Sequence, residues 1–263
     1  MRSRLALAAV LLLGLAPLAP AQTRADFPGG GTRSSFEHPA DPATAPVYYT
    51  VERSVRLHAE PHPASVAAAE LPLRTGVRVL AQDGAWSLVD HENRRGYVPT
   101  AALSNVWIRI DKSERTLYVY RGDVLAYALP ADVSTSDEDK VRRSGLGEQD
   151  HYRIPEGTFY VTRKNPDSQY YRAFVISYPN SEHAARGLRQ GLITQAQYDA
   201  IVRAEQTFTS PPMGTRLGGL IEIHGQGSGR RRAWTRGCVA LRNVHMDDLW
   251  DLVHVGTPVV IER

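Results

Sequence analysis

This sequence has little cysteine and little excess charge, and both shortages exclude classes of structure or function. Cys238 is the single cysteine among 263 residues, so an internal disulfide is impossible. Lys and Arg number 31 against 28 Asp and Glu, a balance that gives no reason to expect a nucleic-acid partner. The long apolar run, residues 5–18, is shorter than the roughly 20 residues that a membrane-spanning helix needs. Stable membrane insertion is therefore not expected.

Residues 1–21 have the layout of a secretory signal peptide. Two arginines precede the apolar run, and residues 19–21, A-P-A, form a small-x-small cleavage site. We therefore expect an exported protein in a bacterial periplasm. A free thiol in such an oxidising compartment indicates a chemical role for Cys238. Residues 22–45 are rich in Pro, Gly, Ser, Thr and Asp and are expected to form a disordered linker.

Residues 46–104 contain short apolar runs separated by turn residues, a pattern that predicts a small all-β module. Its segments V-R-L-H-A-E-P, L-R-T-G-V-R-V-L, G-A-W-S-L-V and R-R-G-Y-V-P resemble bacterial SH3-like domains. The resemblance implies either binding of wall peptides or positioning of a catalytic neighbour, and both interpretations remain open. His58 and His62 are spaced like a helical metal pair, but Pro61 and Pro63 exclude that helix. No metal site is expected.

The strongest chemical signal lies in residues 219–242. A strand-like run leads to His224 at the start of a glycine-rich loop, and the triplet T-R-G presents Cys238 before a second apolar run. The loop can fold back and bring imidazole to thiol, and an imidazole that accepts the thiol proton activates the sulfur as a nucleophile. Gly225 and Gly237 leave room for a substrate backbone. They also let nearby amides turn toward an oxyanion.

This arrangement, I-x-I-H-G followed by T-R-G-C-V, resembles the active-site signature of the YkuD family, the L,D-transpeptidases of bacterial cell walls. The resemblance implies that His224 is the general base and Cys238 the acylated nucleophile, with the Gly237 region holding the oxyanion. The expected donor is a peptidoglycan stem peptide, attacked at the carbonyl of the L-centre of its third residue. Neither a metal nor an organic cofactor is implied.

The direction of the chemistry is left open by the residues around the motif. Most family members carry arginine where this sequence has Ala240, and C-V-A-L agrees with the YafK-like branch, as do residues 168–171 and 176–180. Some members of that branch release a wall-bound lipoprotein. The acyl-enzyme is therefore expected to react with an amine, forming a crosslink or attaching an outer-membrane lipoprotein, or with water, trimming stem peptides or releasing the lipoprotein.

Substrate contacts are expected on both sides of the thiol. Arg236 is the cation nearest Cys238 in the chain, and guanidinium matches carboxylate geometry. Residues 230–232, three consecutive arginines, could serve the same purpose or form a solvated loop. The expected substrate-contacting residues are Arg236, Thr235, Gly225, Tyr171 and Trp234.

Residues 105–263 are expected to form a second domain that begins with a hairpin of alternating residues. The expected fold class is mainly β: a small SH3-like barrel followed by a YkuD-type β-sandwich or barrel with a few short helices, in a monomer. Residues 132–150, charged and Ser-rich, are expected to be a surface loop. Residues 181–206 predict two short helices, the second capped by Thr194, that either cover the substrate cleft or pack as a flank. Asn243 is expected to cap a last helix.

Three other functions remain as alternatives. A papain-like wall peptidase also pairs with SH3-like modules, but its cysteine precedes its histidine by a long stretch, which the order of His224 and Cys238 contradicts. A phosphate-binding loop at residues 225–229 lacks the required lysine and following helix. A non-catalytic peptidoglycan-binding protein predicts that Cys238→Ala changes nothing.

Overall fold

The computed structural model describes residues 35–143 and 152–263. The predicted signal peptide, residues 1–21, lies outside the described residues, as do residues 22–34 of the expected linker. Residues 35–45 of that linker pack against the first sheet. The ring centroids of Phe36 and Tyr97 lie 5.0 Å apart, and Ala45 is only 3% exposed beside Leu80.

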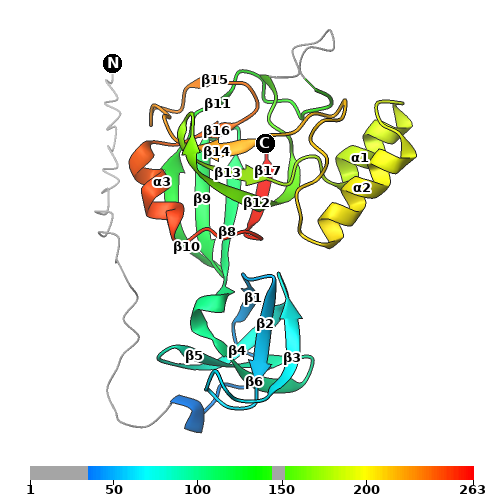
Figure 1. The fold of residues 1–263 in the computed structure, drawn as a ribbon. Helices are drawn as coiled ribbons and strands as arrows, with labels where there is room; N and C mark the ends of the chain where they lie inside the picture. Colours follow the sequence, from blue (N-terminus) through cyan, green and yellow to red (C-terminus); the bar gives the residue numbers. More distant parts are fainter. Residues whose placement is uncertain (1–34, 144–151) are drawn as a thin grey trace, which may run out of the picture. The chain divides into compact units, whose positions relative to one another are not determined.

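The N-terminal part of the described chain forms a seven-stranded antiparallel sheet in the order β3-β2-β6-β5-β4-β1-β7 (Figure 1). Buried and exposed residues alternate along β2, as the short apolar runs predict. Val55, Leu57, Val79 and Val98 meet in its core. The strands are β1 (Val47–Thr50), β2 (Ser54–His58), β3 (Ala67–Pro72), β4 (Gly76–Asp83), β5 (Trp86–His91), β6 (Arg94–Pro99) and β7 (Leu103–Ser104); two 3₁₀ turns are η1 (Ser35–Glu37) and η2 (Thr100–Ala102).

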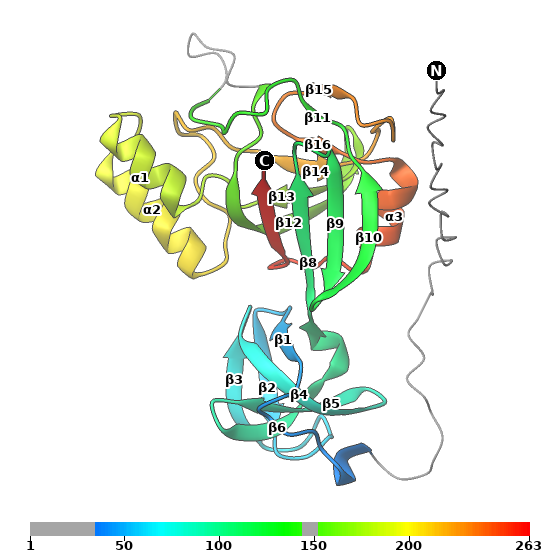
Figure 2. The same cartoon turned by 180° about the vertical axis from the view of Figure 1, so that it is seen from behind.

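An eight-stranded sheet follows in the order β10-β9-β8-β17-β12-β13-β14-β16 and curls into a half-barrel (Figure 2). Its pairs are antiparallel except β17 with β8 and β14 with β16, which are parallel. The strands are β8 (Val106–Asp111), β9 (Thr116–Arg121), β10 (Val124–Pro130), β12 (Gly157–Ser168), β13 (Tyr171–Ile176), β14 (Glu222–His224), β16 (Val239–Ala240) and β17 (Pro258–Glu262). A short parallel pair, β11 (Val133–Ser134) with β15 (Ala233–Thr235), completes the described strands.

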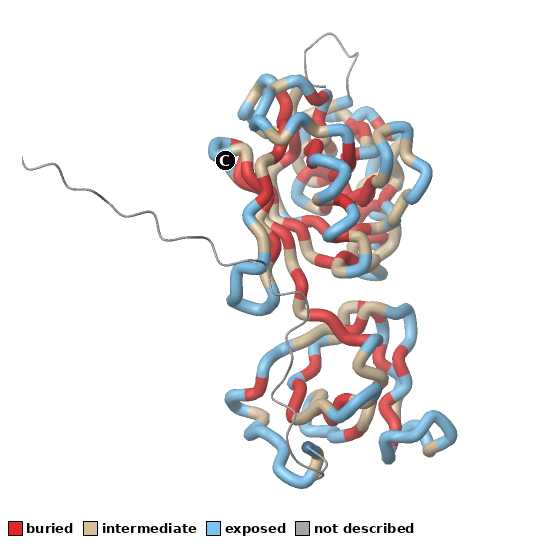
Figure 3. The backbone as a smooth tube through the Cα atoms, turned by 90° about the vertical axis from the view of Figure 1, so that its left-hand side faces the viewer, coloured by how far each residue is buried: buried red, intermediate tan, exposed pale blue. Residues whose placement is uncertain are grey.

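Helix α3 (Asn243–Trp250) lies at one flank of the eight-stranded sheet, and helices α1 (Ser181–Arg189) and α2 (Gln195–Gln206) lie at the other (Figures 1 and 2). Met246 and Leu249 of α3 join the core of the sheet. Thr194 caps α2 in a full capping box with Gln197, which confirms the predicted cap. Figure 3 shows that buried segments lie mainly inside each folded part, whereas many of the outer turns are exposed. The predicted mainly-β fold is confirmed.

Candidate active site

The two predicted catalytic residues lie at the ends of neighbouring strands. The parallel register of β14 and β16 pairs Ile223 with Val239 and His224 with Ala240. Ile223 and Val239 both face the apolar core. Because successive side chains point to opposite faces of a strand, His224 projects away from that core. Cys238, the residue before Val239, projects from the same face.

This register places the Cα atoms of His224 and Cys238 on the order of 8 Å apart, given a rise of ~3.3 Å per residue and ~4.8 Å between strands. Sγ of Cys238 lies 3.8 Å from the carbonyl oxygen of Leu220. Among the hydrogen bonds of the described residues, none joins Sγ to the imidazole. Proton transfer therefore requires the thiol to leave Leu220 and rotate toward His224, a tightening that resting active sites commonly need.

The imidazole of His224 is held in one tautomer. Its Nδ1 lies 2.7 Å from the carbonyl oxygen of Gly225, which can only accept, so Nδ1 carries the hydrogen and Nε2 the lone pair. Burial lowers the pKa of His224, and the bond to Gly225 opposes this only in part. The imidazole is therefore neutral near pH 7, and its Nε2 can accept a proton.

The thiol of Cys238 is protonated in the resting structure. Burial raises the pKa of Cys238 to about 12, and the carboxylate of Glu222 adds to the rise. A hydrogen bond with the backbone of Glu222 and the positive charge of Lys140 act in the opposite direction. The pair thus rests as thiol and neutral imidazole. This favours removal of the proton during attack over a preformed thiolate–imidazolium pair.

Aromatic rings enclose the imidazole. Tyr170 stacks on His224 with ring centroids 4.5 Å apart and planes at 26°, and Trp234 approaches it edge-on at 6.3 Å. Tyr171, the tyrosine that the sequence indicated for substrate, donates its hydroxyl to Asp247 of α3 at 2.8 Å. Tyr170 is therefore the tyrosine that contacts the predicted base.

A buried carboxylate organises the glycine-rich loop between the two catalytic candidates. Asp132 accepts hydrogen bonds from the amide and hydroxyl of Ser228, both at 2.7 Å, from the amide of Arg232 at 2.9 Å and from Nε1 of Trp234 at 2.8 Å. Its backbone also exchanges two hydrogen bonds with Ala240 of β16. One side chain thus ties the loop to the strand that follows Cys238.

Asp132 is not among the residues predicted from the sequence, because residues 132–150 were expected to form a surface loop. That assignment is wrong at its beginning: Asp132, Val133 and Ser134 are 0%, 3% and 5% exposed. The available signal was a single acidic residue between apolar Ala131 and Val133, which is where a buried, fully bonded carboxylate is expected.

Asp132→Asn is expected to destabilise the protein by about 3 kcal/mol, because an amide retains one acceptor oxygen and turns its own N–H groups toward donors. Burial alone would raise the pKa of Asp132, but the bonds from Ser228 and Trp234 outweigh it and lower the pKa. The wild-type contribution is therefore present above the ordinary carboxyl pKa of ~3.9 and lost as the pH falls through the lower folded value. Urea unfolding at pH 7 and at acid pH measures both effects.

Asp123→Asn, at an exposed turn, is the matched control and should leave the urea midpoint unchanged. An equally small effect of Asp132→Asn would contradict the role given to this carboxylate.

Two predicted residues beside the thiol make internal hydrogen bonds. Oγ1 of Thr235 donates to the carbonyl of Cys238 at 2.6 Å. The amide of Gly237 donates to Oγ of Ser134 at 2.9 Å. Because the amide of Gly237 is already bonded to Ser134, the amide of Cys238 is the better candidate for an oxyanion donor.

Gly225 lies against α3 and the β12–β13 hairpin. A Cβ added there would meet Oδ1 of Asn243 at 2.7 Å and the carbonyl of Tyr170 at 2.8 Å, so no larger residue fits without movement. Asn243 was predicted to cap α3, and this is wrong. It is the first residue of the helix, after Arg242, and its Oδ1 accepts from the amide of Gln226 at 2.7 Å. The side chain bonds the glycine-rich loop and so cannot cap.

Arg236 is exposed and lines a cavity of about 350 Å³ together with Lys140, Arg143 and Leu220. Leu220 is the residue whose carbonyl contacts the thiol sulfur, so the cavity lies beside the predicted nucleophile. Residues 230–232 are exposed and lie outside the set that lines this cavity.

No group of three or more His, Cys, Asp or Glu side chains that could hold a metal ion occurs among residues 35–143 and 152–263. Within the same ranges, no helix is both long and apolar enough to cross a bilayer.

Residues 105–261 match the family model YkuD, described as the L,D-transpeptidase catalytic domain. The match covers more than half of the chain, and the protein belongs to this family of peptidoglycan-acting enzymes. No curated protein matches the chain.

Several solved structures are similar to this chain at low sequence identity. An L,D-transpeptidase from Xylanimonas cellulosilytica is 17% identical over 60% of this chain and 61% of its own, with a TM-score of 0.37. The helical cell shape determining protein Pgp2 from Campylobacter jejuni is 22% identical over 61% of this chain and 47% of its own, with a TM-score of 0.40. Bd1075 from Bdellovibrio bacteriovorus is 22% identical over 60% and 48%, with a TM-score of 0.37. This chain thus spans about half to three fifths of their lengths.

Proposed function

We propose that this protein is a cysteine acyltransferase acting on peptidoglycan stem peptides, with Cys238 as nucleophile and His224 as general base. The observation that carries the proposal is the parallel pairing of β14 and β16, which puts both side chains on one face beside the cavity at Leu220. The neutral imidazole with its lone pair on Nε2 supplies the base that a thiol of high pKa needs.

In the proposed reaction, Sγ of Cys238 attacks the carbonyl carbon at the L-centre of the third stem residue while Nε2 of His224 takes the thiol proton. The amide C–N bond breaks, and the imidazolium returns the proton to the leaving amine. The amide of Cys238 would stabilise the oxyanion. An amine then takes the acyl group and forms a new amide, or water takes it and forms a carboxylate, and the thiol is regenerated.

Hydrolysis is the second candidate, favoured by Ala240. This residue is 0% exposed and pairs with His224, at the position where most relatives of the motif carry arginine. The sequence C-V-A-L at this strand, which resembles the YafK-like branch, supports a reaction that trims stem peptides or releases a wall-bound lipoprotein.

The remaining parts are proposed to serve this chemistry. Residues 1–21 would direct export to the periplasm, where the wall lies, and residues 22–34 of the expected linker would join them to the part that begins at residue 35. Residues 46–104 are proposed as an SH3-like module that binds wall peptide or positions the catalytic domain, residues 105–263. The antiparallel sheet β1–β7 supports the module.

Transfer and hydrolysis are separated by incubating the purified protein with labelled muropeptides as acyl donors and an acceptor amine, then resolving the products by mass. We expect labelled acyl product to form at the expense of the donor. A new amide identifies transfer, and a shortened stem without amine identifies hydrolysis. An unchanged muropeptide profile with wild-type protein would contradict both candidates.

A further inference from the structure

Cationic side chains line the cavity beside the thiol. Lys140, Arg143 and Arg236 line it, and none of its lining residues in the described part of the chain is acidic. Lys140 is 4% exposed, so its charge sits within the protein wall rather than in open solvent. A cavity of this kind favours an anionic group.

The cavity also lies close to Sγ of Cys238. The carbonyl of Leu220, another lining residue, contacts Sγ of Cys238 at 3.8 Å. Arg236 precedes Cys238 by two positions, and the charge of Lys140 is felt at the thiol. Because consecutive Cα atoms are about 3.8 Å apart, a group one residue beyond the scissile carbonyl can enter this cavity.

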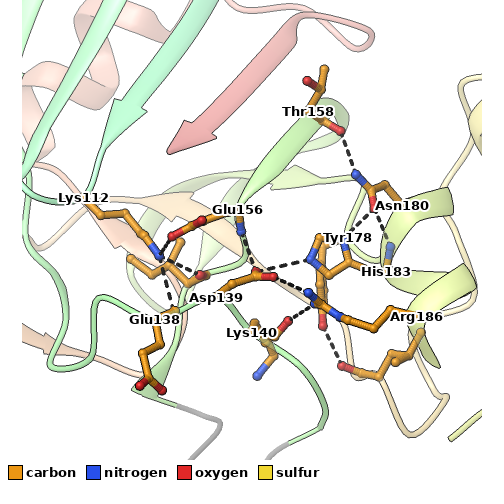
Figure 4. A network of polar contacts seen from close by, with 12 residues as sticks. Lys112, Glu138, Asp139, Lys140, Glu156, Thr158, Tyr178, Asn180, His183 and Arg186 are labelled. Carbon is orange, nitrogen blue, oxygen red and sulfur yellow. Dashed lines mark hydrogen bonds and ion pairs between the residues drawn. The ribbon is translucent and has the colours of Figure 1, made fainter. Parts of the chain in front are cut away.

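Two cations of the cavity stand on the segment 139–143, here called the cation loop, which is anchored at both ends. Arg186 of α1 binds Oδ2 of Asp139 at 2.6 Å and donates to the carbonyl of Lys140 at 2.6 Å (Figure 4). At the other end, the amide of Arg143 donates to the carbonyl of Arg216 at 2.6 Å.

Further contacts hold Asp139 in place. Its Oδ1 accepts from the amide of Glu156 at 2.9 Å and faces Nε2 of His183 at 3.5 Å (Figure 4). Burial alone would raise the pKa of Asp139, but its bonds to His183, Glu156 and Arg186 keep the pKa well below the ordinary value. The carboxylate is therefore charged at neutral pH, and α1 is joined to the cation loop by an ion pair.

We propose that this cavity binds the free carboxylate of the residue that leaves the acyl donor, and that Arg186 of α1 positions the cation loop for it. The inference rests on the proposed function and names the part of the donor that is recognised. Arg143 and Arg236 supply guanidinium groups, which match a carboxylate in geometry and charge. The helical pair α1–α2 is then a specificity element: it sets where the cations stand, and a donor without a terminal carboxylate binds poorly.

The test uses the full chain carrying Cys238→Ala, so that binding is measured without turnover. Two probes are titrated by calorimetry: a stem tetrapeptide ending in D-alanine with a free carboxylate, and the same peptide ending in a carboxamide. We expect the acid to bind about 10- to 100-fold more tightly than the amide, the range of a hydrogen-bonded charge pair. Adding Arg143→Gln should remove most of this preference.

Arg186→Met should reduce the acid-over-amide preference several-fold, with less effect on binding of the amide, because the loop loses its anchor. Arg186→Lys should restore part of the preference, since it keeps the charge opposite Asp139. Arg189→Met is the matched control, since Arg189 is exposed on the same helix and should leave the preference intact. Thermal melts confirm that each variant is folded, and a general loss of stability would weaken both probes alike.

Equal binding of acid and amide, or a preference that survives Arg143→Gln and Arg186→Met, would overturn the inference. The proposed function is read separately, from the mass of wild-type protein incubated with either tetrapeptide. Acylation of wild type without an acid preference removes the carboxylate site and keeps the enzyme. An acid preference without acylation keeps the site and removes the proposed chemistry.

Discussion

Replacing Cys238 by alanine is expected to lower kcat/KM for stem peptides by about 10⁴-fold or more, because the acyl-enzyme cannot form without the sulfur. Removal of a nucleophile from a catalytic unit typically leaves only the small rate that binding and oxyanion stabilisation provide. Product formation from labelled muropeptides measures the loss.

The alanine variant is expected to fold, because Cys238 is only partly buried as a residue and its neighbours Thr235 and Gly237 are held by other hydrogen bonds. Binding of a stem peptide should persist in this variant. Turnover by Cys238→Ala within tenfold of wild type would instead support a protein in which the cysteine has no chemical part, as in the wall-binding alternative.

Replacing His224 by glutamine is expected to lower kcat by about 10²- to 10⁴-fold, the usual contribution of a general base. KM should change little, because the imidazole is buried under Tyr170 and not part of the cationic cavity. Glutamine can still donate to the carbonyl of Gly225, so the loop should keep its anchor. Single-turnover acylation measures the rate constant of the chemical step, and steady-state product formation gives kcat and KM.

The pH dependence separates the base from a structural histidine. Neutral imidazole is the active form, and burial lowers the pKa of His224 below its ordinary value of ~6.5. Wild-type acylation should therefore hold from pH 8 down past that value and fall only as the pH drops through the lowered pKa. His224→Gln should lack this inflection, whereas His254→Gln, in the segment after α3, should retain it. An unchanged profile in His224→Gln would assign the base to another group.

Patterns among neighbouring residues were sufficient to predict the strands beside His224 and Cys238 and the start of α2. The run before His224 and the run after Cys238 predicted two strands, and the structure pairs them. Thr194 predicted a helix start, and the structure completes that cap as a capping box with Gln197, three residues along the chain. These features rest on interactions between near neighbours, which a single sequence displays.

The contacts that hold the site together were not predictable in the same way. Asp132 bonds Ser228 and Trp234 across about a hundred positions, and Ser134 bonds the amide of Gly237 across a similar distance. Such pairings depend on which strands meet in space, and no periodicity encodes that. The cap expected at Asn243 failed for the same reason, because a distant amide, that of Gln226, took its side chain.

The helical pair α1–α2 shows what the sequence could and could not predict. Its apolar face predicted helices, and the structure has them at Ser181–Arg189 and Gln195–Gln206. Their role, as a cover of the cleft or as a packed flank, was not predictable. It depends on contacts such as the ion pair of Arg186 with Asp139, which is 47 positions away. That pair links the insertion to the cation loop.

The mass of the intact protein after incubation with a carbapenem tests the central claim most directly. A strained β-lactam carbonyl can be attacked by Sγ in place of the stem-peptide carbonyl, and opening of the ring C–N bond leaves the acyl group on the sulfur. We predict that the wild-type mass increases by that of one ligand and that proteolysis locates it on the peptide containing Cys238. The adduct should be absent in Cys238→Ala and form more slowly in His224→Gln. An unmodified wild-type mass, or an adduct on any other residue, would contradict the account.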